Sequence, residues 1–326
     1  MRLHLAPKRW GVYFAVIAIL MAGMLIRTSY SVLAPGRALD LRSVVSVAGH
    51  QAPATHYYLT DVAFIPDANL FGLLAGLQPG WEIVPSDQVV PAGVDDAAFD
   101  RQMTVEMNGS QRIAAYVAER AAGLEVGNVR ARIFVWDVLP DSHASGVLHQ
   151  SDMMVAIDGR PVADSAAVAA ILSHRRAGER VSVTVRRAGH RVEVVFATIA
   201  LGGRARLGVR LVERPILPSL PLAVNYAIAN ISGSSGGLMF ALDVYRSLRP
   251  ARRSPAGRIA GTGTLDARGD VGEVDGTRQK LIAAQRAGAT MFLVPARNVR
   301  DVSSVPGMRI VAVRTFADAL AATGGL

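Results

Sequence analysis

The residues best suited to chemistry are a serine in a glycine-rich turn and a lysine that follows it along the chain. The turn, Gly233-Ser234-Ser235-Gly236-Gly237, separates an apolar run over 221–231 from another over 238–248. The first run predicts a buried strand and the second a buried helix. The turn therefore places a hydroxyl at a helix N-terminus, where free backbone N–H groups and the helix dipole favour negative charge. The oxyanion of an acyl-transfer reaction needs that environment.

A serine nucleophile in this turn needs a base other than histidine. The turn matches G-x-S-x-G, the nucleophile elbow of α/β-hydrolases, in which an acidic residue and then a histidine follow the serine. All seven histidines of this chain precede Ser235. The order that these hydrolases need, serine followed by an acidic residue and then a histidine, is therefore excluded.

The candidate base is Lys280. The chain has 35 Lys and Arg residues, of which only Lys8 and Lys280 are lysines. Arginine keeps its proton at physiological pH, whereas a lysine removed from water can lose it and act as a general base. The spacing predicts a short helix over 276–288 that places Lys280 on one face with three alanines, Ala283, Ala284 and Ala287. Another element can pack closely on that small apolar face and remove the Lys280 ammonium from water, which lowers its pKa and favours a Ser235–Lys280 dyad. The alternative is a lysine on the solvent-facing side of a helix.

The same segments resemble the proteolytic domain of the Lon protease family. The turn with Leu238-Met239-Phe240 resembles that domain's G-P-S-A-G-L loop, with Ser234 in place of the usual Pro and Gly236 in place of the usual Ala. The run 259–265 resembles the family's T-G-T/E strand. The run 271–280 resembles its G-x-x-x-x-G-x-x-x-K segment, with Asp275 replacing a usual glycine.

The resemblance implies a Lon-type α/β proteolytic domain over 206–326 and a role for each matching residue. It makes Ser235 the nucleophile and Lys280 the base. For the oxyanion hole we expect the backbone N–H groups of Ser234, Ser235 and Gly236. Thr262 or Thr264 supports the dyad lysine by analogy with Lon-like sites, and an ordinary buried strand threonine is the alternative.

Residues 124–200 resemble a PDZ domain, which is rich in strands and carries a helix. The run 138–162 matches its pattern of small residues, Gly and Leu, then a strand and Asp-Gly, with Ser151 where Gly is usual. A predicted helix over 164–173 and strands over 181–186 and 191–196 complete it. PDZ domains bind extended peptides by strand addition beside such a helix. Three of its apolar residues either line the peptide groove or belong to the core: Val168, Ile171 and Leu172.

The N-terminal segment predicts a transmembrane anchor within residues 1–30. Residues Trp10 to Ile26 are uncharged and almost wholly apolar, Lys8 and Arg9 precede them, and Arg27 follows. These charges favour a single-pass cell-membrane protein with a cytoplasmic N-terminus and an extracytoplasmic catalytic part. The alternative is a cleaved signal peptide, which also exports the remaining chain.

Residues 31–123 show mixed signals and no evident chemistry. Strands are predicted over 43–47 and 56–64, and a helix over 99–120. The stretch 35–41, with 58–60, resembles the opening of membrane-anchored Lon-like proteases that also carry a PDZ domain. We expect this region to serve packing and spacing.

Composition excludes several other functions. The net charge is +9, but the arginines are scattered, aromatic residues make up 6%, and no nucleic-acid-binding signature appears. The chain has no cysteine, so disulfides and thiolate metal sites are excluded. Neither lysine lies in a phosphate-binding Gly-Lys-Ser/Thr loop. We therefore expect no cofactor, no metal, no nucleic acid and no ATP.

Together these features predict a multidomain α+β protein that acts as a membrane-anchored, ATP-independent serine endopeptidase on exported or membrane-associated polypeptides. The PDZ domain would bind the substrate or a partner protein. The competing hypothesis is a catalytically inactive, membrane-tethered PDZ adaptor. Lon-like domains often form rings, so a homo-oligomer is possible.

Overall fold

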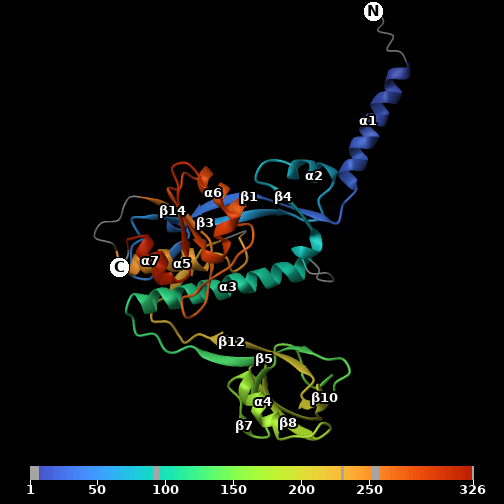
Figure 1. The fold of residues 1–326 in the computed structure, drawn as a ribbon, viewed down its shortest axis with the longest axis vertical. Coiled ribbons are helices and arrows are strands. Elements are labelled where there is room, and N and C mark those ends of the chain that lie inside the picture. The colour runs from blue at the N-terminus through green and yellow to red at the C-terminus, as the bar shows by residue number, and fades with distance from the viewer. Residues whose placement is uncertain (1–6, 91–95, 229–230, 251–256, 325–326) are drawn as a thin grey trace, which may run out of the picture. The chain divides into compact units, whose positions relative to one another are not determined.

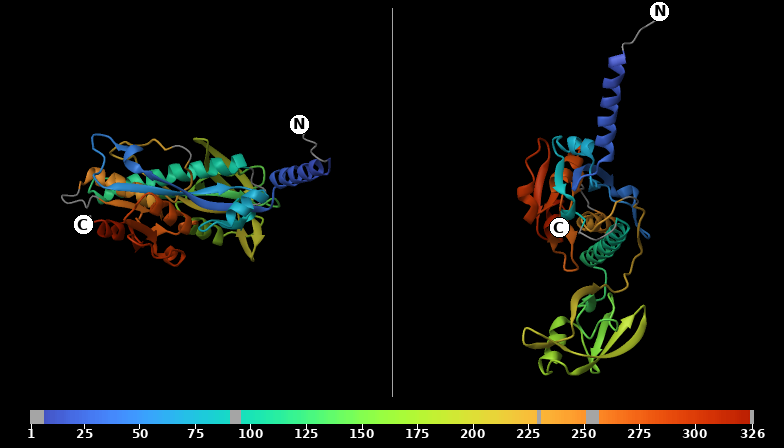
Figure 2. Two further views of the ribbon diagram at one scale, coloured as in Figure 1. Left: turned by 90° about the horizontal axis from the view of Figure 1, so that it is seen from above. Right: turned by 90° about the vertical axis from the view of Figure 1, so that its right-hand side faces the viewer.

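The computed structural model describes residues 7–90, 96–228, 231–250 and 257–324, and it divides the chain into two compact units (Figures 1 and 2). The first unit is discontinuous in sequence and comprises Met1–Val126 and Leu220–Leu326. The second comprises Gly127–Ser219. From the sequence we expected residues 31–123 and 206–326 to form separate domains, whereas most of both lie in the first unit.

A six-stranded sheet explains why the two segments of the first unit belong together. Its strands, in spatial order, are β18 (Arg309–Val313), β17 (Met291–Pro295), β14 (Arg258–Gly261), β3 (His56–Ile65), β1 (Tyr30–Asp40) and β4 (Glu82–Pro85). The strands from β18 to β3 are parallel, and β1 runs antiparallel to β3 and β4. Strand β3 therefore joins the two parts of the chain in one sheet, since it pairs with β1 from the part before the second unit and with β14 from the part after it.

Helix α5 (Gly237–Leu248) forms the centre of the first unit. Ten of its twelve residues are buried, as the apolar sequence after the turn predicts. The long helix α3 (Asp96–Ala121) lies along α5, and α6 (Thr277–Arg286) packs on β1 and β3 (Figure 1). Helix α7 (Phe316–Ala322) begins with a capping box between Thr315 and Asp318.

Short elements complete the first unit. Two two-stranded pairs form, β2 (Val45–Val47) with β13 (Val224–Tyr226) and β15 (Thr264–Leu265) with β16 (Val271–Gly272). The remaining helical turns are η1 (Leu41–Ser43), α2 (Leu70–Gly76), η2 (Ser86–Gln88) and η3 (Ala296–Asp301). The long buried strand predicted over 221–231 is wrong. Among the described residues of that range, only Val224–Tyr226 is a strand, because its partner β2 offers three residues, and none of the three is buried.

The N-terminal helix α1 (Pro7–Leu25) covers most of the segment predicted as a membrane anchor. Within the described part of the chain, no helix combines the length and the apolar character needed to cross a membrane. The predicted transmembrane helix is therefore not supported. Residues 1–6 of the predicted cytoplasmic stub lie outside the described residues.

The second unit is a β-rich domain around its own core. The sheet follows the order β12 (Val209–Ile216), β5 (Arg130–Val138), β6 (Met153–Ile157), β8 (Arg180–Arg187) and β9 (His190–Ala197), with β7 (Arg160–Pro161) paired to β6. Helix α4 (Ser165–Ser173) and the pair β10 (Ile199–Leu201) and β11 (Arg204–Arg206) complete it. Strand β12 lies beyond residue 200, where the sequence analysis ended this domain, yet it pairs with β5 from Val209 to Ile216.

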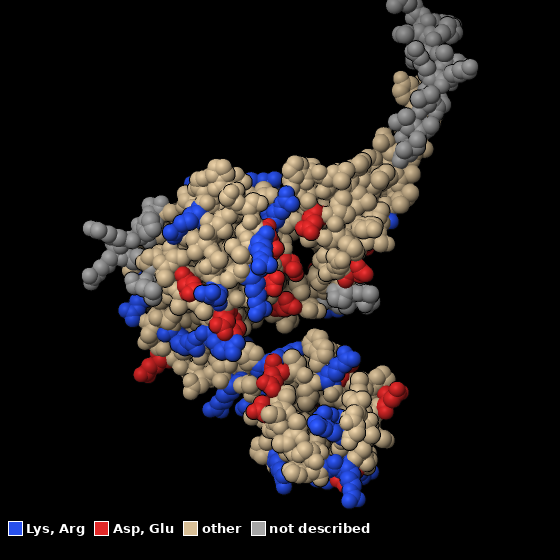
Figure 3. All heavy atoms as spheres, viewed as in Figure 1, with Lys and Arg blue, Asp and Glu red and all other residues tan. Residues whose placement is uncertain are grey.

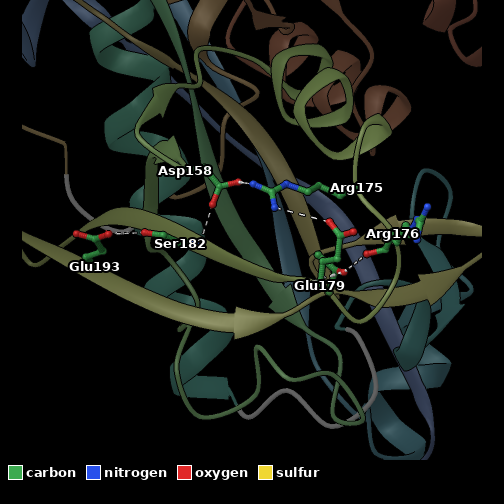
Figure 4. Close-up of polar contacts among 7 residues, drawn as sticks. Asp158, Arg175, Arg176, Glu179, Ser182 and Glu193 are labelled. Atoms are coloured by element: carbon green, nitrogen blue, oxygen red, sulfur yellow. Dashed lines mark hydrogen bonds and ion pairs between the residues drawn. The ribbon is translucent and has the colours of Figure 1, made fainter.

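A polar network holds the turn between β6 and β7 in this unit (Figure 4). The Asp158 carboxylate accepts hydrogen bonds from the Arg175 guanidinium at 2.6 Å and from the Ser182 backbone N–H at 2.9 Å. Arg175 also lies 3.7 Å from Glu179. Asp158 and Gly159 both have positive φ, of 48° and 74°, as the Asp-Gly pair predicts for a tight turn.

Candidate active site

The serine turn is held from two sides by backbone and hydroxyl contacts. On one side, the Ser110 hydroxyl of α3 donates to the Ser234 carbonyl oxygen at 2.9 Å, and the Gly233 N–H donates to the Met103 carbonyl at 3.1 Å. On the other side, the Gly263 N–H donates to the Ser235 carbonyl at 2.8 Å. These contacts fix the backbone on both sides of the Ser235 side chain, which is half-buried.

The turn leaves three backbone donors available at the start of α5. The first two N–H groups of α5 are used, since Gly237 donates to the Ser234 carbonyl and Leu238 to the Gly263 carbonyl. Among the residues that the structure describes, none accepts a hydrogen bond from the N–H of Ser234, Ser235 or Gly236. The three donors that the sequence analysis assigned to the oxyanion hole are thus unpaired beside the candidate nucleophile.

Close packing around position 236 favours glycine. A Cβ atom there would lie 2.8 Å from Leu59 Cδ1 and 2.9 Å from Phe240 Cε2. Both neighbours are almost fully buried. Side chains from β3 and α5 therefore fill the space that an alanine methyl group would occupy.

Lys280 lies in the first turns of α6 and faces the interior. Its backbone N–H donates to the Gly276 carbonyl at 3.0 Å, and its residue is only 5% exposed. Gly276 has a φ of +66°, and a Cβ atom there would lie 2.6 Å from Val62 Cγ2 of β3, so glycine lets α6 start close to the sheet. Ala283 and Ala284 are buried on the same face, as the helical spacing predicts.

Burial of Lys280 changes its acidity in the direction that a base requires. Removal of the ammonium from water lowers the pKa of Lys280 to about 8, and the negative charges of Asp275 and Asp61 oppose this shift. No hydrogen bond or ion pair of its Nζ occurs within the described part of the chain. At neutral pH a useful fraction of the side chain is therefore the free amine.

One cavity contains both candidate catalytic side chains. It has a volume of about 710 Å³ and is lined by residues that include Ser235 and Lys280. Ser234 and Gly236 also line it. A polypeptide carbonyl that enters this cavity can therefore meet a hydroxyl, an amine and unpaired backbone donors together.

The two threonines proposed as dyad support have different surroundings. Thr262 is fully buried and its hydroxyl donates to the Ser235 carbonyl at 3.3 Å, so it holds the nucleophile's backbone. Thr264 is half-buried and lines the cavity with Lys280.

Sequence reasoning missed the contribution of residues 31–123, for which it expected only packing and spacing. These residues supply 15 of the 27 that line the cavity, from β1, β3, β4, η2 and α3. Asp61 on β3 also acts electrostatically on Lys280. No local pattern marks these residues, because they reach the site only through the sheet pairing of β3 with β14.

The apolar residues of α4 mostly serve the core of the second unit. Val168 and Leu172 are 5% and 4% exposed and belong to the central hydrophobic cluster. Ile171 is half-buried at the edge of that cluster. Asp164 caps α4 by accepting a hydrogen bond from the Ala167 N–H at 2.7 Å.

Family models match two segments of the chain. Residues 121–197 match the PDZ domain, and residues 230–321 match the C-terminal proteolytic domain of Lon protease (S16). The chain contains a PDZ domain and a Lon-type proteolytic domain. The PDZ match lies largely in the second unit, and the Lon-type match contains Ser235 and Lys280. The Lon-type match supports serine-type peptidase activity.

Curated relatives are similar to a limited part of the chain. Lon protease 2 of Herpetosiphon aurantiacus is 41% identical over 76 residues, which are 23% of this chain and 9% of that protein. Lon protease of Clostridium beijerinckii is 40% identical over 74 residues, which are 21% of this chain and 9% of that protein. The match therefore spans about a tenth of the length of these relatives.

Solved structures of PDZ domains match a similar share of the chain. The PDZ domain of the SdrC-like protein from Listeria monocytogenes is 23% identical with a TM-score of 0.24, and the match covers 24% of this chain and 86% of that one. The PDZ domain of the SdrC-like protein from Listeria innocua is 22% identical with a TM-score of 0.24, and the match covers 24% of this chain and 92% of that one.

Proposed function

We propose that this protein is a serine endopeptidase that cleaves polypeptides with a Ser235–Lys280 dyad. The observation that carries the proposal is the shared cavity, whose lining includes a half-buried serine, a buried lysine and a turn with three backbone N–H groups that have no acceptor among the described residues. The similarity to Lon-type proteolytic domains supports the same chemistry.

The first half of the reaction forms an acyl-enzyme. The neutral Lys280 amine takes the proton from the Ser235 hydroxyl, and the Ser235 oxygen attacks the carbonyl carbon of a peptide bond. The backbone N–H groups of Ser234, Ser235 and Gly236 stabilise the resulting oxyanion. When the C–N bond breaks, the Lys280 ammonium returns its proton to the leaving amine.

The second half releases the product. Lys280, neutral again, takes a proton from a water molecule, whose oxygen attacks the ester carbonyl of the acyl-enzyme. A second oxyanion forms in the same position. Collapse of this intermediate breaks the ester bond, and Lys280 protonates the Ser235 oxygen, which restores the dyad.

The proposal includes cleavage without ATP. The chain contains no Gly-Lys-Ser/Thr phosphate-binding loop, so none of its residues is arranged to hold a nucleotide in that way. Without coupled unfolding, the accessible substrates are unstructured or already unfolded polypeptide segments. We further propose that the PDZ domain binds these substrates or a partner through an extended peptide.

The decisive experiment measures cleavage of an unstructured protein by the full chain and by Ser235→Ala and Lys280→Arg variants, with and without ATP. Arginine keeps the positive charge of Lys280 but cannot give up its proton. We expect cleavage by the wild type alone, unaffected by ATP. Cleavage that survives either substitution contradicts the role of that residue, and an ATP requirement contradicts ATP independence.

The competing function is a PDZ adaptor with an inactive proteolytic domain. It predicts that polypeptides captured by the PDZ domain remain intact in the presence of the wild-type chain. Incubating captured partners with wild type and with Ser235→Ala distinguishes the two functions, since only a protease produces fragments that the variant does not.

A further inference from the structure

The cavity around the dyad is lined by an excess of acidic side chains. Six carboxylates line it: Asp61, Glu82, Asp100, Glu106, Glu273 and Asp275. Lys280 is the only lysine or arginine among its lining residues. The whole chain has a net charge of +9, so the local charge is opposite to that of the molecule. Figure 3 shows acidic side chains gathered on one face of the first unit, with basic side chains beside them.

These carboxylates are not neutralised by ion pairs. In the part of the chain that the structure describes, no salt bridge involves any of the six. Three of them accept hydrogen bonds from neutral donors: Glu82 from Gln279 Nε2 at 3.1 Å, Glu106 from Gln102 Nε2 at 3.2 Å, and Asp61 from the Arg37 backbone N–H. Their negative charges therefore remain available to a ligand.

A metal ion does not account for this charge. Among the described residues, no group of three or more acidic or histidine side chains is arranged to hold one. The carboxylates instead come from separate walls of the cavity, on β3, β4, α3 and the segment before α6. The 95% buried Lys280 side chain, with no described hydrogen-bond partner, marks the same cavity as a site that a ligand enters.

We propose that the cavity selects polypeptide segments that carry lysine or arginine side chains near the bond to be cleaved. This inference rests on the proposed peptidase function and names its substrate class. A cleft that is lined by charges of one sign and has apolar walls concentrates the electrostatic field and attracts ligands of the opposite charge. The carboxylates lie around the dyad rather than at one point, so basic side chains on either side of the scissile bond can be bound.

The first test compares internally quenched, unstructured peptides that are identical except for the residues flanking one central bond. These residues are Lys/Arg, Gln or Glu. We expect kcat/KM to fall in the order basic, neutral, acidic. The preference should shrink as salt rises from about 0.05 M to about 0.5 M, because screening weakens interactions between exposed charges. Equal cleavage of the three peptides at low salt overturns the inference and leaves the peptidase function intact.

The second test removes charge from one wall of the cavity. The double variant Asp100→Asn/Glu106→Gln keeps side-chain size on α3, and we expect the basic-to-acidic ratio of kcat/KM to fall about threefold to tenfold. The control Asp87→Asn/Glu125→Gln removes the same charge at exposed positions that do not line the cavity. If the control lowers the basic-to-acidic ratio of kcat/KM equally, the effect comes from the net charge of the chain, and the role of the cavity is overturned.

Two further measurements support these tests. A variant on another wall of the cavity covers the case in which the α3 variant fails to fold, and a binding assay does not depend on catalysis. Glu273→Gln changes an exposed side chain on another wall and should lower the same ratio. Fluorescence anisotropy with the Ser235→Ala variant measures binding of the same peptides without turnover. Preferential binding of basic peptides, with no cleavage by the wild type, supports the charge selection while contradicting the peptidase function. Absence of any binding preference in this assay contradicts the charge selection.

Discussion

At the scale of single residues, the proposed mechanism depends on how far burial lowers the pKa of Lys280. The Lys280 ammonium loses hydration inside the first unit, which lowers its pKa to about 8, while Asp275 and Asp61 keep it from falling further. A lysine with an ordinary pKa would be almost wholly protonated at neutral pH and a poor base.

This leads to a prediction for the pH dependence of activity. Below pH 8 the neutral fraction of Lys280 rises about tenfold per pH unit, so kcat/KM should rise with pH and level off above about pH 8. Asp275→Asn removes a charge that raises this pKa, so its profile should shift to lower pH. The measurement is kcat/KM against pH with an uncharged peptide, and a shift of the variant to higher pH would contradict the assignment of Lys280 as the base.

A second prediction concerns Gly236, where the Lon family usually has alanine. A methyl group at this position meets the buried side chains of Leu59 and Phe240. Gly236→Ala should therefore lower the free energy of unfolding by about 1–3 kcal/mol and reduce activity. Urea denaturation and kcat/KM measure both effects. Leu59→Val in the same chain makes room and should restore part of each loss, whereas independent, additive effects of the two substitutions would show that Leu59 is not the obstacle.

At the scale of elements, α5 and α3 each carry a buried carboxyl group. Asp243 of α5 is fully buried, and neither of its carboxylate oxygens has a hydrogen-bond partner in the described structure. Burial raises the pKa of Asp243 to about 7, with a further contribution from Asp40 that Arg42 opposes. Burial also raises the pKa of Glu119 on α3, and neither of its carboxylate oxygens has a hydrogen-bond partner in the described structure.

These groups should make the first unit less stable as pH rises. A carboxyl whose pKa is higher in the folded state binds more protons there, so Asp243 makes the free energy of unfolding fall between about pH 4 and pH 7, by up to about 1.4 kcal/mol per pH unit, and Glu119 acts in the same direction. Asp243→Asn should flatten this slope. Urea denaturation from pH 4 to pH 8 measures it, with the exposed Asp87→Asn as a control that keeps the wild-type slope. An unchanged slope in Asp243→Asn would show that Asp243 does not carry the effect.

At the scale of the whole molecule, the PDZ-containing unit is an insertion into the proteolytic unit. Residues Gly127–Ser219 form a compact unit with its own core, and in the sequence they lie between helix α3 and strand β13 of the other unit. Strand β12 pairs with β5 at eight positions and forms the edge of the sheet. The sequence-based boundary at residue 200 leaves this strand out.

The resulting prediction compares two fragments. The fragment 127–219 should fold alone and unfold in one cooperative thermal transition. The fragment 127–200 loses β12 and exposes the backbone N–H and C=O groups of β5, so its Tm should be lower by several degrees or its transition should be absent. Circular dichroism during heating measures both. Equal Tm values would mean that β12 adds nothing to this fold.

The sequence by itself determined the candidate catalytic residues and the elements next to them. The Gly/Ser turn before an apolar helix, the single lysine on an alanine-lined helix face and the Asp-Gly turn of the PDZ domain are local patterns, and the structure contains α5, α6 and the β6–β7 turn at those places. Local backbone chemistry and helical periodicity are sufficient for such features. The extracytoplasmic location stays a prediction.

Only the tertiary structure decided what surrounds the dyad. The Thr60 hydroxyl of β3 donates to the Gly261 carbonyl of β14 at 3.0 Å across 201 residues, and this pairing brings residues 31–123 into the proteolytic unit. The acidic lining of the cavity and the pKa of Lys280 follow from it. Pairing between distant strands depends on burial shared by both partners, and neither segment carries a signal for it alone.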